Sequence, residues 1–167
     1  MKLCRVGEPG LEKPAIIDKD NTIRDLSTII SDLNPKTLNF ETIDKINSIN
    51  INDLTEINSN LRMGPCVGNP SKFLGIGLNF KDHALEQNLP IPEEPIIFSK
   101  FTNCVCGPND DIEIPKGSEH TDWEVELGFV IGKKAKYIPE NEALKYVLGF
   151  FLVNDVSERN FQKNKGL

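Results

Sequence analysis

Two glutamates at alternating positions in a strand-like run are the residues most suggestive of chemistry. Residues 120–132 read HTDWEVELGFVIG, so Glu124 and Glu126 lead into an apolar segment. Successive strand side chains point to opposite faces, which puts both carboxylates on one face, about 7 Å apart. Shielded from water, two such acids resist joint ionisation, and a divalent cation with a preference for oxygen ligands would remove that cost. A solvated acidic face, common in antiparallel sheets, is the alternative.

A third acid follows another apolar run. Asp155 comes directly after GFFLVN, residues 149–154, and therefore stands at the end of a second predicted strand. It could be a further metal ligand. Alternatively, Asn154 and Asp155 begin a turn, and Asp155 or Ser157 caps a short helix over residues 157–162. The residues alone leave both readings open.

An acid–base pair is predicted in KDHALEQN, residues 81–88. His83 and Glu86 are three residues apart, so on a helix they would share one face. A carboxylate beside an imidazole orients its tautomer and raises its basicity, which suits a general base acting on water. An exposed His–Glu pair on a surface helix is the alternative. The other histidine, His120, is predicted to lie in a loop.

Composition excludes several classes of function. The 167 residues are 38% hydrophobic and 26% charged, with a net charge of −6, as in an ordinary globular protein. An acidic chain without a basic stripe is a poor partner for nucleic acid or anionic membranes. No apolar run approaches the roughly 20 residues that span a bilayer. Four scattered cysteines are expected to stay reduced, and the lone Cys104-x-Cys106 does not make a zinc site, so we expect a cytoplasmic protein.

The chain divides near residue 65. Residues 1–65 are predicted to form a small N-terminal α/β domain with two short strands around a turn at Asn21, a helix over residues 26–33, and an irregular helix beyond. Residues 66–167 alternate short apolar runs with glycine and proline: FLGIGLNF, PIIFSKF, DIEIP, VELGFVIG and YVLGFFLVN. Such runs predict strands. The fold class is therefore predicted to be α+β and mainly β.

Several of these segments, in this order, resemble the fumarylacetoacetate hydrolase family. The matching text is GIGLNFKDHALE, PIIFSKF, GPNDDIEIP, DWEVELGFVIGKKA and YVLGFFLVNDVSERNFQ, which covers residues 70–162. Near the N-terminus, GEPGLEKPAIID and IRDLS are similar to one subgroup of the family. That subgroup includes proteins called ureidoglycolate lyase and 2,4-diketo-3-deoxy-L-fuconate hydrolase.

The resemblance implies a site and an architecture. The implied fold is a β-roll of mixed sheets behind a small N-terminal domain, in a homodimer. The implied divalent metal, commonly Mg²⁺ with Mn²⁺ or Ca²⁺ as alternatives, is held by Glu124, Glu126 and Asp155. His83 and Glu86 would lie on a lid over a small keto-acid substrate. Gln162 would lie near that substrate.

Two departures from the family pattern shape the functional expectation. The segment before His83 is the acid-free FLGIGLN, where fumarylacetoacetase proper supplies a fourth acid ligand. This favours an acylpyruvase-like enzyme that cleaves a carbon–carbon bond in a 2,4-diketo acid and releases pyruvate. Ureidoglycolate cleavage to glyoxylate and urea is the alternative.

The second departure concerns length. Family members continue past residue 167 through a Gly-Lys segment, with a catalytic lysine, and further strands. We therefore expect residues 66–167 to be the N-terminal part of the catalytic β-roll. A third alternative follows, in which the chain is an inactive fragment or half of a split enzyme.

Overall fold

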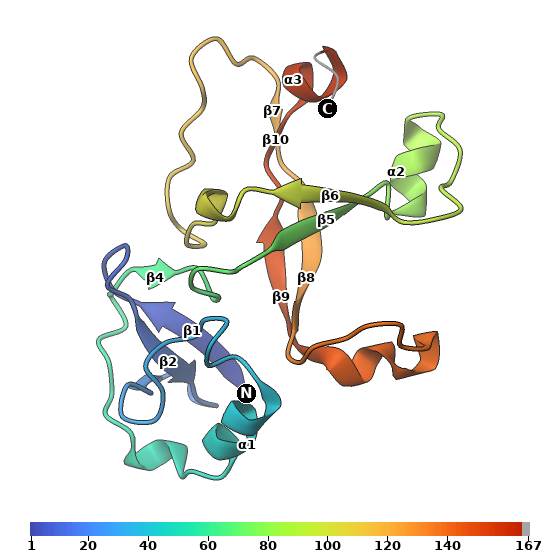
Figure 1. Cartoon of the computed structure of the whole chain (residues 1–167). Coiled ribbons are helices and arrows are strands. Elements are labelled where there is room, and N and C mark those ends of the chain that lie inside the picture. The colour runs from blue at the N-terminus through green and yellow to red at the C-terminus, as the bar shows by residue number, and fades with distance from the viewer. Residues whose placement is uncertain (165–167) are drawn as a thin grey trace.

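The first part of the chain forms an antiparallel sheet. A computed structural model describes residues 1–164 (Figure 1). The strands of this sheet are β1 (Lys2–Val6), β2 (Lys13–Ile17), β3 (Ile23–Asp25) and β4 (Met63–Gly64), in the order β3-β2-β1-β4. The turn between β2 and β3 is held by Asp18, whose carboxylate accepts from the backbone N–H groups of Asp20 and Thr22, while Asn21 adopts a left-handed conformation (φ 62°). The predicted turn is confirmed.

A small apolar core fills the space beside this sheet. Helix α1 (Phe40–Asn47) is capped by Asn39, whose side chain accepts from the Thr42 N–H, and the 3₁₀ turn η1 (Ile51–Asp53) follows. Ile46 from α1 packs with Ile16, Leu26 and Leu33. Within residues 1–164, the buried hydrophobic residues other than Ala84 all precede residue 47. The division at residue 65 itself stays a prediction.

The helix predicted over residues 26–33 is wrong, because this segment forms successive turns. Asp25 accepts from the Ser27 N–H, and Asp32 accepts from the Leu33 N–H. These side-chain acceptors offer the backbone an alternative to helical hydrogen bonds. Leu26, Ile30 and Leu33 are buried in the core although the segment is not helical.

The remainder of the described chain consists of two-stranded antiparallel ribbons and short helices. The ribbons are β5 (Phe73–Gly77) with β6 (Ile96–Lys100), β8 (Val125–Ile131) with β9 (Val147–Asn154), and β7 (Thr121–Asp122) with β10 (Ser157–Glu158). The helical elements are α2 (Lys81–Glu86), η2 (Thr102–Cys104), η3 (Glu140–Tyr146) and α3 (Arg159–Asn164). The β5–β6 ribbon crosses the β8–β9 ribbon near the middle of the molecule (Figure 1).

This arrangement agrees with the predicted α+β, mainly β class, although the sheets do not close into a roll over residues 1–164. The DIEIP run, residues 111–115, was a predicted strand and is extended chain without a ladder. No helix in the described residues is long and apolar enough to cross a membrane.

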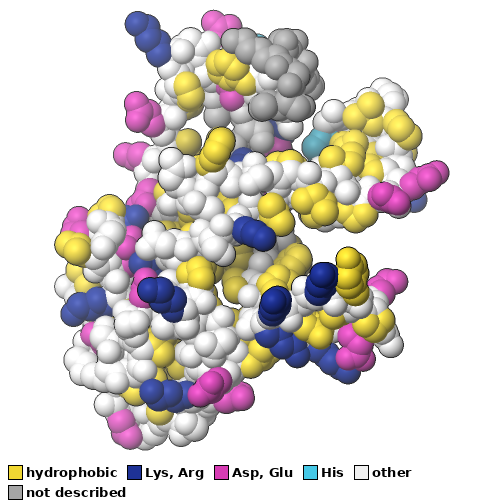
Figure 2. Space-filling model, in the orientation of Figure 1, with side chains coloured by type: hydrophobic (Ala, Val, Ile, Leu, Met, Phe, Trp, Pro, Cys, Tyr) yellow, Lys and Arg dark blue, Asp and Glu magenta, His cyan; other side chains and the backbone are white. Residues whose placement is uncertain are grey.

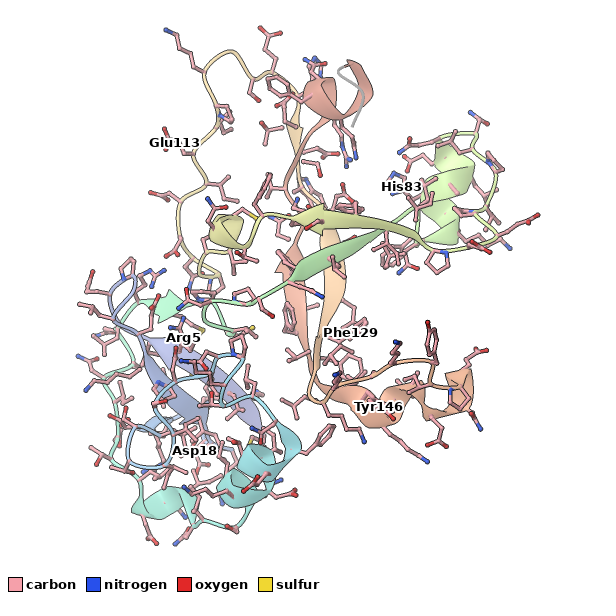
Figure 3. All side chains as sticks on the ribbon, in the orientation of Figure 1. Arg5, Asp18, His83, Glu113, Phe129 and Tyr146 are labelled. Carbon is pink, nitrogen blue, oxygen red and sulfur yellow. The ribbon has the colours of Figure 1, made fainter. Side chains whose placement is uncertain are left out.

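The β8–β9 ribbon has two unlike faces. One face carries exposed apolar side chains, among which Leu127 pairs with Leu152 and Phe129 with Phe150. Figure 2 shows hydrophobic side chains gathered over the middle of the molecule, where this ribbon runs, and Figure 3 shows Phe129 extending from β8. The other face, with Glu126 and Gly128, is half-buried. The carboxylates therefore lie on the more sheltered side of the ribbon.

Candidate active site

Strand register brings three acids together at one end of the β8–β9 ribbon. Val125 pairs with Asn154, so the next opposed pair is Glu124 and Asp155. Their backbones meet there, because the Asp155 N–H donates to the Glu124 carbonyl at 2.9 Å. The Glu124 N–H also donates to the Asn154 side-chain oxygen at 3.1 Å. Opposed residues project to the same face, so Asp155 joins Glu124 and Glu126 there.

The acids lie close enough to affect one another's ionisation. Asp155 is buried, with 8% of its surface exposed, and the two glutamates are half-buried. Burial raises the pKa of Glu126, and the charges of Asp155 and Glu124 raise it further, while Lys100 works in the opposite direction. The face is thus a partly desolvated cluster of like charges.

Lys100 reaches this cluster from the other ribbon. It is the last residue of β6, and its ammonium donates to Asp155 Oδ1 and, at 3.3 Å, to the Val156 carbonyl. Its side chain is 22% exposed. Lys100 therefore neutralises Asp155 and ties the β5–β6 ribbon to the end of β9.

Arg159 neutralises a second acid. Its Nη2 lies 2.6 Å from Glu124 Oε1 and donates to Asp122 Oδ2 at 2.8 Å, and its Nε donates to the same Asp122 oxygen at 3.0 Å. Burial opposes the charge of Arg159, but its bonds to Asp122 and Glu124 raise its pKa overall. The guanidinium therefore bridges β7 and the start of β8.

His83 lies near this end of the molecule. Figure 3 shows it on α2, beyond the end of the β5–β6 ribbon. The hydrogen bonds from Arg159 lower the pKa of Asp122, and the charge of His83 contributes a smaller part of the same shift, so the imidazole lies within electrostatic range of Asp122. His83 is half-buried, and its Nε2 contacts the Gln87 side-chain amide. Since that amide nitrogen is a donor, Nε2 is the acceptor.

The predicted partner of His83 makes no such contact. Glu86 is exposed, and within residues 1–164 no hydrogen bond or ion pair joins it to His83. The two share a short helix as expected, but in this structure Gln87 orients the ring. The predicted role of Glu86 stays a prediction.

The last predicted site residue is linked to the acids indirectly. Gln162, in α3, is exposed and accepts from Arg159 Nη1 at 3.0 Å. Because Arg159 binds Glu124, Gln162 stands one residue away from the cluster. His120 contributes its backbone carbonyl, which accepts from the Arg159 N–H at 3.0 Å, and it lies in the loop before β7 as predicted.

The sequence reasoning assigned no role to Lys100, Arg159 or Asp122. A weak signal existed for two of them. Lys100 is the charged residue that ends the apolar run PIIFSK, and Arg159 follows Asp155 by four residues. Neither position reveals its partner, because Lys100 and Asp155 are 55 residues apart in the chain.

The donor chemistry of the cluster fits a hard divalent cation, since three carboxylates from one ribbon end share a half-buried face. Their arrangement differs from a formed site. Asp155 is bonded to Lys100 and Glu124 to Arg159. Across residues 1–164, no group of three or more His, Cys, Asp or Glu side chains is placed to hold a metal ion. A cation would have to displace at least one of these two side chains.

Comparisons with known proteins show to which family the chain is related. Residues 72–166 match the family described as "Fumarylacetoacetate (FAA) hydrolase C-terminal". A Burkholderia cenocepacia protein named "Putative hydrolase" is 51% identical over 99% of this chain, and the chain spans 59% of that relative's length.

Two solved structures from Mycobacterium smegmatis have the same fold. One, described as "a putative HpcE protein", is 28% identical with a TM-score of 0.82, covering 98% of this chain and 57% of its own. The other, a 5-carboxymethyl-2-hydroxymuconate delta-isomerase, is 26% identical with a TM-score of 0.70, covering 100% of this chain and 59% of its own. With more than half of its residues matched, the chain belongs to the fumarylacetoacetate hydrolase family.

Proposed function

We propose that the protein is a divalent-metal-dependent hydrolase that cleaves a carbon–carbon bond in a 2,4-diketo acid and releases pyruvate. The observation that carries the proposal is the cluster of Glu124, Glu126 and Asp155 on one face of the β8–β9 ribbon. Family membership supports an enzyme of this general class. The particular substrate is our inference from the site and from the resemblance of its motifs.

Glu124, Glu126 and Asp155 are the residues that would hold the metal. Mg²⁺ is the expected ion, and Mn²⁺ or Ca²⁺ would suit the same carboxylates. When bound, such an ion supplies Lewis-acid polarisation of the α-keto acid oxygens. Arg159 stays within reach of the cluster through Asp122 and contributes positive charge beside an anionic substrate.

His83 is the proposed general base. Once the Gln87 amide has moved away from Nε2, this nitrogen takes a proton from water, and the hydroxyl oxygen bonds to the distal carbonyl carbon of the substrate. The bond between that carbon and its neighbour then breaks, leaving a carboxylic acid and the enolate of pyruvate. The proton held by His83 returns to the carbon that was released, which completes the balance.

An isomerase is the second candidate. The observation in its favour is the 26% identity to a delta-isomerase, whose structure matches this chain over its whole length. Moving a double bond in an unsaturated keto acid needs proton removal and return by one base, which His83 would supply without cleaving carbon–carbon bonds. Ureidoglycolate cleavage would use the same three acids and release glyoxylate instead.

The test is an assay of product identity. Purified protein with Mg²⁺ is incubated with acetylpyruvate, with 5-carboxymethyl-2-hydroxymuconate and with ureidoglycolate, and pyruvate, the ultraviolet spectrum and glyoxylate are followed. The proposal expects Mg²⁺-dependent pyruvate release that Glu124→Gln abolishes and that the remote Glu142→Gln leaves unchanged. A spectral shift without pyruvate would establish the isomerase instead.

The assembly and partners are also proposals. We propose a homodimer acting on a small keto acid, without a nucleic-acid or membrane partner. The exposed apolar face of β8 and β9 supports association, since contiguous exposed apolar patches usually mark contacts. Light scattering of the purified protein tests the dimer directly.

A further inference from the structure

Lys100 provides the hydrogen bonds between the two crossing ribbons. Among residues 1–164, its ammonium is the group of the β5–β6 ribbon that donates to the end of β9, through Asp155 and the Val156 carbonyl. At 22% exposed it is partly shielded from water, and Asp155 is buried. The charge pair is therefore formed away from bulk solvent, where its strength is greater than on an open surface.

The carboxylates of Glu124, Glu126 and Asp155 differ in their ion-pair partners. Asp155 is paired with Lys100 and Glu124 with Arg159, whereas Glu126 has no ion pair within the described residues. The two cations also differ in how firmly they are held. Arg159 binds Asp122 through two nitrogens in addition to Glu124. Lys100 has one carboxylate and one carbonyl as partners.

Displacement by a metal ion is consequently easier at Lys100. A lysine ammonium is a compact charge on a flexible stem, while a guanidinium bonded in a fork is fixed in orientation. When the Asp155 carboxylate is released, the Lys100 ammonium can turn to the partly exposed side and remain close to Val156.

We infer that Lys100 is a positioning residue that occupies the Asp155 carboxylate in the metal-free chain and competes there with a divalent cation. The inference rests on the proposed function, because it assumes that Glu124, Glu126 and Asp155 hold a metal. Lys100 then has two effects. It lowers the repulsion among the acids before the ion arrives, and it weakens the affinity for the ion.

The affinity is tested by titrating the protein with Mn²⁺ and measuring the free ion by electron paramagnetic resonance. Lys100→Met is expected to bind Mn²⁺ about tenfold more tightly, the order of effect of removing one positive charge a few ångströms from a divalent ion in a partly hydrated site. Lys100→Arg, which keeps the charge, is expected to stay near the wild-type affinity. Lys145→Met is the matched control, because Lys145 pairs with Glu142 in an exposed position.

Thermal unfolding in EDTA tests the pair without any metal. Lys100→Met and Asp155→Asn are each expected to lower the melting temperature, and the double variant is expected to lower it by less than the sum of the two. Additive effects would overturn the pairing, and an unchanged or weaker Mn²⁺ affinity in Lys100→Met would overturn the competition. If wild-type protein binds no Mn²⁺, the proposed metal site itself fails, whereas Mn²⁺ binding that Glu126→Gln removes and Lys100→Met does not tighten defeats only the inference about Lys100.

Discussion

Replacing Glu12 by glutamine should destabilise the junction between the first sheet and the rest of the chain. The Glu12 side chain is 4% exposed and accepts from Arg5 Nη2 at 3.3 Å and from Arg62 Nη1 at 3.0 Å. Arg62 in turn binds the Asp110 carboxylate through two nitrogens. Glu12 therefore joins strands β1 and β2 to the loop that contains Asp110.

The position of Gly64 shows how closely the Glu12 side chain is packed. A Cβ at Gly64 would lie 2.8 Å from the Glu12 side chain, so a larger residue there would displace the carboxylate. The network is therefore shaped by the backbone around it, and the amide of glutamine fits the space without supplying the charge.

The expected cost follows from the partners that remain. Breaking a buried ion pair by removing one charge typically costs about 3–5 kcal/mol. Arg5 retains Asp32, with Nε at 2.7 Å from Oδ1, and Arg62 retains Asp110 and is 23% exposed. We therefore expect Glu12→Gln to lower the free energy of unfolding by about 2 kcal/mol. In a protein of this size that corresponds to a melting temperature about 4–8 °C lower.

Urea and thermal unfolding at pH 7, followed by circular dichroism, give the measurement. Glu142→Gln is the control, because the Glu142–Lys145 pair is exposed and its loss should cost about 0.5 kcal/mol or less. If Glu12→Gln is no less stable than this control, the buried network does not stabilise the junction.

Three further predictions concern the Glu12 network, Glu126 and the cysteines. Although burial works against it, the hydrogen bond from Arg62 keeps the pKa of Glu12 below its ordinary 4.5, and a hydrogen bond from Arg62 also keeps the pKa of Asp110 below its ordinary 3.8. The two charged carboxylates therefore stabilise the fold at pH values above their unfolded pKa values, and this stabilisation is lost as they become protonated. The free energy of unfolding should fall as the pH drops below about 4.5, and a free energy that does not change with pH would contradict this. The pKa of Glu126 is raised by burial and then by its acidic neighbours, so its charged form destabilises the metal-free fold at pH 7. Glu126→Gln should therefore raise the melting temperature in EDTA, and a lower melting temperature would refute the placement of Glu126 among like charges. With Ellman's reagent at pH 8, exposed Cys104 should react at once, whereas Cys4 should react only on unfolding, because burial raises its pKa to about 11.

The sequence predicted the elements of the site better than their contacts. Alternation in EVELGFVIG placed Glu124 and Glu126 on one face, and the end of the next apolar run marked Asp155. These are local patterns, set by the period of a strand. For Glu124 and Glu126, pattern alone favoured a solvated face, and the order of the family motifs was needed to favour a ligand set.

Contacts between distant segments were not predictable in the same way. Nothing near Lys100 in the chain indicates that it meets Asp155, because their approach depends on how two ribbons cross. The helix predicted over residues 26–33 failed for a different reason, because the side chains of Asp25 and Asp32 accept hydrogen bonds from nearby backbone N–H groups. Leu26 and Leu33 are nevertheless buried in the core beside the first sheet.

The two faces of the β8–β9 ribbon make the site dependent on its register. A shift of one residue between the strands would exchange the faces and carry Glu126 to the exposed apolar side. Gly128 opposes such a shift, because the Phe151 ring lies 2.5 Å from where a Cβ would stand, so the ring packs over the glycine on the acid-bearing face. The bonds of Asp155 to the Glu124 carbonyl and to Lys100 then fix the same register at the ribbon end. The carboxylates are thus positioned by the pairing of one ribbon, by Lys100 from the ribbon that crosses it, and by Arg159 beside Glu124.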